Sequence, residues 1–162
     1  MKQAVSHLLR RGVSTALAAT LLLVTSLPAH ASVQLRGFRG LMWGDPSAHL
    51  GAAERISSDG AVQCYRRTNE NLLFGDSPLQ GVRYCFHRDQ LFMVLVDAAV
   101  DAATLQAEFQ RGYGAPDTAS ASFARWGGPQ APLQVELNPT RSQSAGGATL
   151  RIVASAYAPR VQ

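Results

Sequence analysis

The stretch Val82–Ala99 constrains the fold more than any other part of the chain. It reads VRYCFHRDQLFMVLVDAA, two runs rich in β-branched and aromatic residues on either side of Arg88-Asp89. Such runs around a short polar turn are typical of a β-hairpin. We therefore predict two antiparallel strands with Arg88 and Asp89 as the two turn residues. Because an isolated hairpin is barely stable in water, the rest of the chain must cover or extend it.

A two-residue turn sets a register in which Phe86 lies opposite Leu91 and Cys85 lies opposite Phe92. Side chains alternate across a strand, so this register predicts one apolar core face. Its members are Val82, Tyr84, Phe86, Leu91, Met93 and Leu95. The mixed second face would carry Arg83, Cys85, His87, Gln90, Phe92, Val94 and Val96. Arginine disfavours the positive φ of a type I′ turn, and a one-residue slip would exchange the faces.

Residues 1–31 have the features of a secretory signal peptide. Three basic residues precede an apolar run over 12–27, and an Ala-x-Ala cleavage site ends at Ala31. We predict general secretory export to the periplasm or beyond, with cleavage after Ala31. The remaining residues 32–162 form a single predicted domain without a membrane span. An uncleaved membrane anchor is the alternative.

Removal of the leader nearly neutralises the chain. Of the 15 basic residues three lie in the leader, which leaves 12 arginines against 11 acidic residues. The basic balance of the whole chain is therefore no evidence for a nucleic-acid partner. The exported part has no lysine. Codon bias in a GC-rich genome explains this, and selection of arginine for bidentate anion contacts is the alternative.

The chain has two cysteines, Cys64 and Cys85. An even number in an exported protein predicts a disulfide, because the compartment is oxidising. Closing a loop of this length would stabilise the fold by about 3 kcal/mol in the chain-entropy model. Two buried free thiols are the alternative.

The other patterns predict a mixture of strands and two helices. Asp45 as N-cap and Pro46 at the first position predict a helix over Ser47–Arg55. Asp101 as N-cap predicts a second helix that ends near Gly112. The remaining strand-like segments are Val33–Trp43, Ala61–Thr68, Phe123–Trp126, Leu133–Leu137 and Thr149–Tyr157. The predicted fold class is α+β: an antiparallel sheet of about six strands, a meander around the hairpin 82–97, with both helices packed on it.

Three segments carry a resemblance to known proteins. They are Phe38–Gly44, Val82–Val96 and Tyr113-Gly114-Ala115-Pro116. With the leader, this pattern resembles a group of small periplasmic proteins of Gram-negative bacteria that has no agreed function. More distantly it resembles the beta-lactamase-inhibitor-protein and outer-membrane assembly lipoprotein superfamily, which packs small helices on an antiparallel sheet. The chain departs from that superfamily in lacking a lipobox cysteine and in carrying Asp45-Pro46-Ser47 where Met-Thr is usual. The resemblance implies protein binding rather than catalysis.

The chain offers no familiar catalytic or cofactor motif. His49 and His87, the two histidines after the leader, have no metal-ligand partner at usable spacing. Phosphate-loop, nucleophile-elbow and His-Glu-x-x-His patterns are absent. We therefore predict no catalytic residue, metal or cofactor. Paired carboxylates such as Asp97 and Asp101 would need a cleft to act as a glycosidase.

Aromatic and arginine residues that the core does not need suggest a binding surface, since tryptophan, tyrosine and arginine are enriched in binding hot spots. The candidates are Trp43, Tyr65, Arg66, Arg67, Arg83, His87 and Trp126. For each tryptophan a core or core-edge position is the favoured interpretation, and for the arginine cluster a solvated strand face. The sequence thus predicts an exported binding, adaptor or inhibitor-like domain that contacts another envelope protein. A small envelope hydrolase and a structural envelope component are the alternatives.

Overall fold

The computed structural model describes residues 35–139 and 147–160, so the predicted leader and its cleavage site lie outside the described residues. The helical elements are η1 (Ser47–Leu50), a single 3-10 turn, and α1 (Ala102–Tyr113). The strands are β1 (Gly37–Phe38), β2 (Leu41–Met42), β3 (Ala53–Asp59), β4 (Val62–Arg67), β5 (Leu73–Phe74), β6 (Ser77–His87), β7 (Gln90–Ala98), β8 (Thr118–Ala119), β9 (Ala124–Trp126), β10 (Leu133–Pro139) and β11 (Ala148–Ala154).

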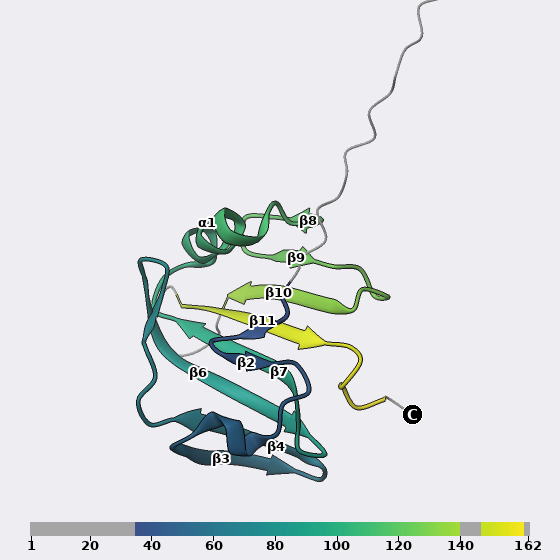
Figure 1. The fold of residues 1–162 in the computed structure, drawn as a ribbon. Coiled ribbons are helices and arrows are strands. Elements are labelled where there is room, and N and C mark those ends of the chain that lie inside the picture. The colour runs from purple at the N-terminus through teal and green to yellow at the C-terminus, as the bar shows by residue number, and fades with distance from the viewer. Residues whose placement is uncertain (1–34, 140–146, 161–162) are drawn as a thin grey trace, which may run out of the picture.

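One antiparallel sheet of nine strands dominates the fold (Figure 1). Its order is β3-β4-β6-β7-β11-β10-β9-β8, and β5 pairs with β6 off this path. Strands β1 and β2 form a separate two-stranded sheet. The predicted α+β fold of about six strands and two helices is therefore wrong. The described chain is mostly antiparallel β structure, with α1 as its single α-helix.

The predicted helix over Ser47–Arg55 is replaced by η1 and β3. Gly51, at φ +73°, ends the helical turn after Leu50. The residues beyond it pair with β4 as an edge strand, and this pairing outweighs the weak helical pattern. Asp45 is not an N-cap, because its carboxylate accepts a hydrogen bond from the Met42 N–H at 2.9 Å.

The helix predicted from Asp101 is present as α1. The Asp101 carboxylate accepts a hydrogen bond from the Thr104 N–H at 2.8 Å, as an N-cap does. The helix buries Ala102, Leu105 and Phe109 and packs against β6, β10 and β11. It continues to Tyr113 and ends at Gly114 (φ +87°), one half-turn later than the sequence predicts.

The central hairpin is formed by β6 and β7, and its turn is the predicted one. Arg88 and Asp89 both have positive φ, +52° and +61°, and Phe86 pairs with Leu91. A β-bulge then shifts the register, so that Cys85 pairs with Met93 rather than with Phe92. One extra residue in β7 is enough to exchange the two faces of the strand beyond it.

The bulge corrects the predicted core face. Val94 and Val96 are fully buried beside Tyr84 and Val82, whereas Met93 and Leu95 lie on the other face and are half-buried. The prediction that Met93 and Leu95 belong to the main core is therefore wrong.

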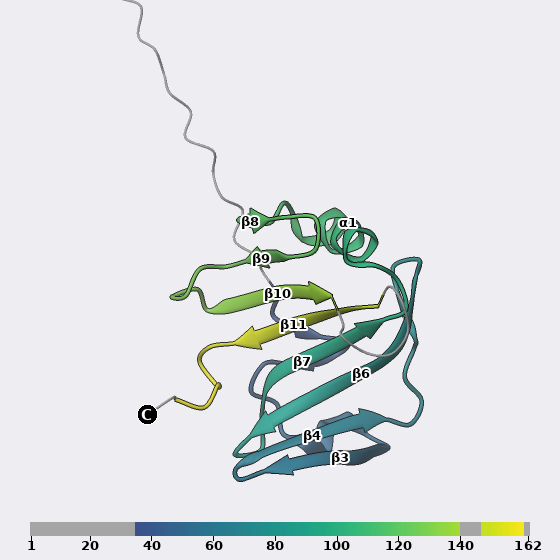
Figure 2. The ribbon, with the colours of Figure 1, turned by 180° about the vertical axis from the view of Figure 1, so that it is seen from behind.

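The two faces of the sheet have different covers. We call the face that packs against the β1–β2 hairpin and α1 the front face, and it holds the main hydrophobic core. Figure 2 shows the other face, the back face, where no described helix lies over the strands. A smaller cluster on the back face includes Cys85, Phe92 and Val153. The predicted disulfide is confirmed there: Cys64 and Cys85 are cross-strand partners with their Cα atoms 4.1 Å apart.

Candidate binding pocket

A cavity of about 540 Å³ opens between β2, the loop that joins β9 to β10, and the segment after β11. Its size falls in the range of pockets that hold a small molecule or a partner's side chain. We call it the Trp43 pocket. The lining residues are Leu35, Arg36, Met42, Trp43, Asp117, Gly127, Gly128, Ala131, Pro132, Leu133, Ala154, Ala156 and Tyr157.

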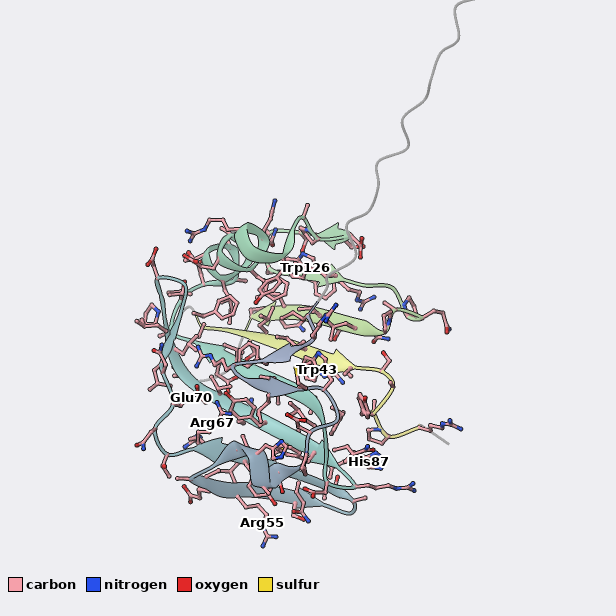
Figure 3. The ribbon with its side chains drawn as sticks, viewed as in Figure 1. Trp43, Arg55, Arg67, Glu70, His87 and Trp126 are labelled. Carbon is pink, nitrogen blue, oxygen red and sulfur yellow. A yellow bond between two sulfur atoms is a disulfide. The ribbon has the colours of Figure 1, made fainter. Side chains whose placement is uncertain are left out.

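Trp43 is held in one orientation at the wall of this pocket (Figure 3). Its indole Nε1–H donates to the Leu35 carbonyl at 2.7 Å, and its backbone N–H donates to the Arg36 carbonyl at 3.3 Å. The side chain is half-buried. Met42 beside it also lines the pocket and is 51% exposed. The pair therefore presents an oriented apolar wall to solvent.

Tyr157 also lines the pocket, and the position of its ring accounts for the glycine at position 44. A Cβ at Gly44 would lie 2.7 Å from the Tyr157 ring, and Gly44 also has φ +88°. A side chain at position 44 would therefore displace the ring and strain the backbone. The Tyr157 side chain packs against both the main core and the back-face cluster, which ties the segment after β11 to the sheet.

Two charged residues line the Trp43 pocket. The Asp117 carboxylate accepts a hydrogen bond from the Gly127 N–H at 2.7 Å, so it holds the β9–β10 loop. Arg36 is exposed. The other lining residues are mostly apolar. Asp117 is the one carboxylate of the lining, which contains no histidine.

Trp126, the second tryptophan of the predicted binding set, belongs to the core. It is 1% exposed, and its indole N–H donates to the Gly114 carbonyl at 2.8 Å. Its ring meets the edge of Phe109, 4.7 Å between centroids. It presents no surface to a partner.

Arg67 lies beneath the β1–β2 hairpin rather than on a free surface (Figure 3). Its guanidinium stands 5.0 Å from the Tyr84 ring centroid and donates to the Arg39 carbonyl at 3.1 Å. Beside it the Glu70 carboxylate accepts from the Tyr84 hydroxyl at 2.7 Å and from the Arg39 guanidinium at 2.5 Å. Burial, and then the hydrogen bond to Glu70, raises the pKa of Tyr84.

The same Arg39 guanidinium donates to the carbonyls of Asn71 and Leu73. Arg39 thus fastens the tip of the β1–β2 hairpin to the loop after β4. This cluster has a structural role, because Arg39 pairs with Glu70 and Arg67 contacts the Tyr84 ring and the Arg39 carbonyl.

The other predicted residues are dispersed. The Tyr65 ring packs edge-on against Phe86 at 5.6 Å between centroids. Arg66 is exposed, and Arg83 donates two hydrogen bonds of 3.1 Å to the Asp97 carboxylate. His87 lies at the end of β6, with Nδ1 3.3 Å from the Tyr157 carbonyl oxygen. The seven predicted residues therefore form no single site, and Trp43 alone among them lines the pocket.

Sequence reasoning missed Met42, Tyr157 and the β9–β10 loop as parts of this site. The pocket is assembled from three segments that are far apart in the chain, so no local pattern reports it. The one available signal was glycine next to an aromatic residue, as at Trp43-Gly44.

Within residues 35–139 and 147–160, no three His, Cys, Asp or Glu side chains are grouped so that they could hold a metal ion. In the same residues, no helix has the length and apolar character needed to span a membrane. No protein-family model, curated protein or solved structure matches this chain.

Proposed function

We propose that this protein is an exported binding domain, adaptor or inhibitor-like, that holds an apolar side chain of a partner protein in the Trp43 pocket. The observation that carries the proposal is the cavity of about 540 Å³ with an oriented tryptophan in its wall. Sites of this kind combine an apolar lining with a few polar groups that set orientation.

The chemistry of the lining supports an apolar occupant. Trp43, Met42 and Tyr157 offer ring and thioether surface, and burial of such surface stabilises a complex by about 25 cal/mol per Å² before the entropic losses of association. Asp117 is already engaged by the Gly127 N–H. A lining with one engaged carboxylate and no histidine favours binding over hydrolysis, because hydrolysis needs a general acid and a base within reach of the substrate.

Export is part of this proposal. The Cys64–Cys85 disulfide is compatible with an oxidising compartment, and the leader over 1–31 has the pattern of a secretory signal. Recovery from the periplasm of a chain that begins at Ser32 would support it. A chain of full length in the membrane fraction would contradict it.

Site-specific photocrosslinking tests the pocket. We would place p-benzoylphenylalanine at Met42, on the pocket rim, and in a second sample at Leu72, which is 46% exposed and does not line the pocket. In exporting cells we expect a discrete crosslinked species from position 42 and none from position 72. Ala156→Phe, which fills the pocket from its exposed rim, should reduce the crosslink at least several-fold.

Crosslinking of equal yield from the two positions would contradict the proposal. So would a species from position 42 that Ala156→Phe leaves unchanged. Circular dichroism of each purified variant shows whether it is folded. A folded variant without the crosslink has lost the partner.

A further inference from the structure

A second cavity, of about 460 Å³, lies at the tip of the β6–β7 hairpin, beside the segment that follows β11. We call it the hairpin-tip cavity. Its lining includes one histidine and two arginines: His87, Arg88 and Arg160. The other lining residues are Gln90, Ala156, Tyr157, Ala158 and Pro159. None of the described carboxylates lines it.

The backbone N–H of Arg88 donates to the Ala61 carbonyl at 3.1 Å, but the side chains of Arg88 and Arg160 make no hydrogen bond or ion pair with any residue that the structure describes. The nearest carboxylate in sequence is Asp89, and it binds Ser47 instead of an arginine. It accepts a hydrogen bond from the Ser47 N–H at 2.9 Å, and hydrogen bonds from Ser47 lower the pKa of Asp89. Both arginines therefore line the cavity, and neither guanidinium group has a neutralising partner among residues 35–139 and 147–160.

The backbone conformation at Arg88 indicates a functional reason for arginine at this position. Arg88 has φ +52° in a turn where Asn or Gly is the favoured residue. A left-handed conformation costs a residue with a Cβ about 1–2 kcal/mol. The side chain is exposed and packs into no core, so fold stability does not explain the choice of arginine. Backbone strain without a packing reason is typical of functional positions.

His87 adds an oriented ring. Its Nδ1 lies 3.3 Å from the Tyr157 carbonyl oxygen, so Nδ1–H is the donor to that carbonyl. The edge-to-face contact with Phe92, 6.3 Å between centroids, fixes the ring plane. With Nδ1 engaged, Nε2 is the ring nitrogen left for a ligand, and it is a donor when the ring is protonated.

We propose that the hairpin-tip cavity binds an oxyanion, a carboxylate or phosphate group, through Arg88, Arg160 and His87. Guanidinium groups match the planar, bidentate geometry of such anions. The site draws on two segments, the β6–β7 turn and the residues after β11, so the fold itself brings its charges together.

This proposal stands without the function proposed for the Trp43 pocket. The two cavities share Ala156 and Tyr157 in their linings, so Tyr157 is a common wall. A ligand or peptide with an apolar group next to an anionic group would match both cavities.

Histidine ring resonances in NMR spectra of the purified protein test the site at a fixed pH of about 6.5, near the ordinary titration of histidine. Sodium phosphate is titrated against sodium chloride at constant ionic strength, with sodium acetate as a second arm. We expect a saturable shift of the His87 resonances with phosphate or acetate, and none with chloride. His49, which is 60% exposed and pairs with Asp45 at 3.4 Å, is the internal control and should not follow the titration.

Substitutions assign the shift to the cavity. Arg88→Gln and Arg160→Gln should each weaken the oxyanion affinity by about tenfold, the loss of one charge-assisted contact. Arg55→Gln, on the edge strand β3, removes an exposed arginine that does not line the cavity and should leave the affinity unchanged. Backbone amide spectra show whether each variant keeps the fold.

The relative affinities for phosphate and acetate identify which anion class the site prefers. An equal shift with chloride would overturn the proposal, as would an affinity that neither Arg88→Gln nor Arg160→Gln changes.

Discussion

Glu70 is a largely buried carboxylate on which the attachment of the β1–β2 hairpin depends. Its side chain is 6% exposed, and it accepts hydrogen bonds from Tyr84 and Arg39. Buried polar groups of this kind stabilise a fold only while every partner is present, because an unpaired partner retains the full cost of desolvation.

Tyr84 makes this cluster sensitive to alkaline pH. Its pKa is raised from the ordinary 10.0, first by burial and then by Glu70. Over the range in which the unfolded chain has lost this phenolic proton and the folded chain keeps it, stability falls as pH rises. We expect the free energy of unfolding in urea to be constant near pH 8 and to decrease above about pH 10.

Tyr84→Phe should lower the unfolding free energy by about 1 kcal/mol at pH 8 and remove most of the alkaline decrease. Tyr113→Phe, which leaves the Glu70 cluster intact, should retain that decrease. A Tyr84→Phe variant with the same alkaline decrease as the native protein would show that another group is responsible.

At the scale of elements, the β6–β7 turn has a backbone conformation that its residue types disfavour. Both turn residues have positive φ, and the chain uses Arg and Asp there instead of Asn and Gly. Asp89 has a structural reason, its hydrogen bond to the Ser47 N–H. Arg88 has none in the described residues, which is why we place it in the oxyanion site.

Arg88→Asn should therefore stabilise the protein, because Asn tolerates the left-handed region better than Arg. The expected gain is about 0.5–1 kcal/mol in urea unfolding. Asp89→Asn relieves little strain and weakens the bond to Ser47, so it should not give the same gain. A destabilised Arg88→Asn variant would mean that the arginine side chain supports the fold.

At the scale of the whole molecule, the Cys64–Cys85 disulfide links β4 to β6 across a sequence separation of 21 residues. It joins the outer strands β3 and β4 to the centre of the sheet. A crosslink of this kind acts mainly by restricting the unfolded chain.

Cys64→Ala/Cys85→Ala should lower the free energy of unfolding by about 3 kcal/mol while the native sheet persists, because the β6–β7 pairing does not depend on the sulfur atoms. Urea unfolding measures the loss of free energy, and far-ultraviolet circular dichroism shows whether the sheet persists. The native protein under a reducing agent provides the matched control and should show a similar loss. An unchanged unfolding midpoint in the double variant would contradict this account.

Local patterns in the sequence were enough to predict several features of the fold. Apolar runs around Arg88-Asp89 determined the hairpin and its turn, and Asp101 with the apolar stripe after it determined α1. Two cysteines allow a single pairing, so their even number and the predicted export were enough to predict the disulfide. Each of these signals is contained within a few residues or in a count, and therefore needs no knowledge of distant contacts.

Tertiary structure alone decided the rest. The bulge in β7 places Met93 and Leu95 with the back-face cluster, and Val94 and Val96 in the main core. Strand β3 exists because β4 offers an edge, which a weak helical pattern could not reveal. Trp43 and Trp126 each adjoin a glycine, yet one lines a pocket and the other fills the core.

The two cavities also depend on tertiary structure alone. Each is assembled from segments remote in sequence, and only the folded sheet brings Tyr157 beside Gly44 and places Arg88 and Arg160 in the lining of one cavity. Strand register and cavity shape depend on non-local contacts, whose free energy a local pattern does not contain.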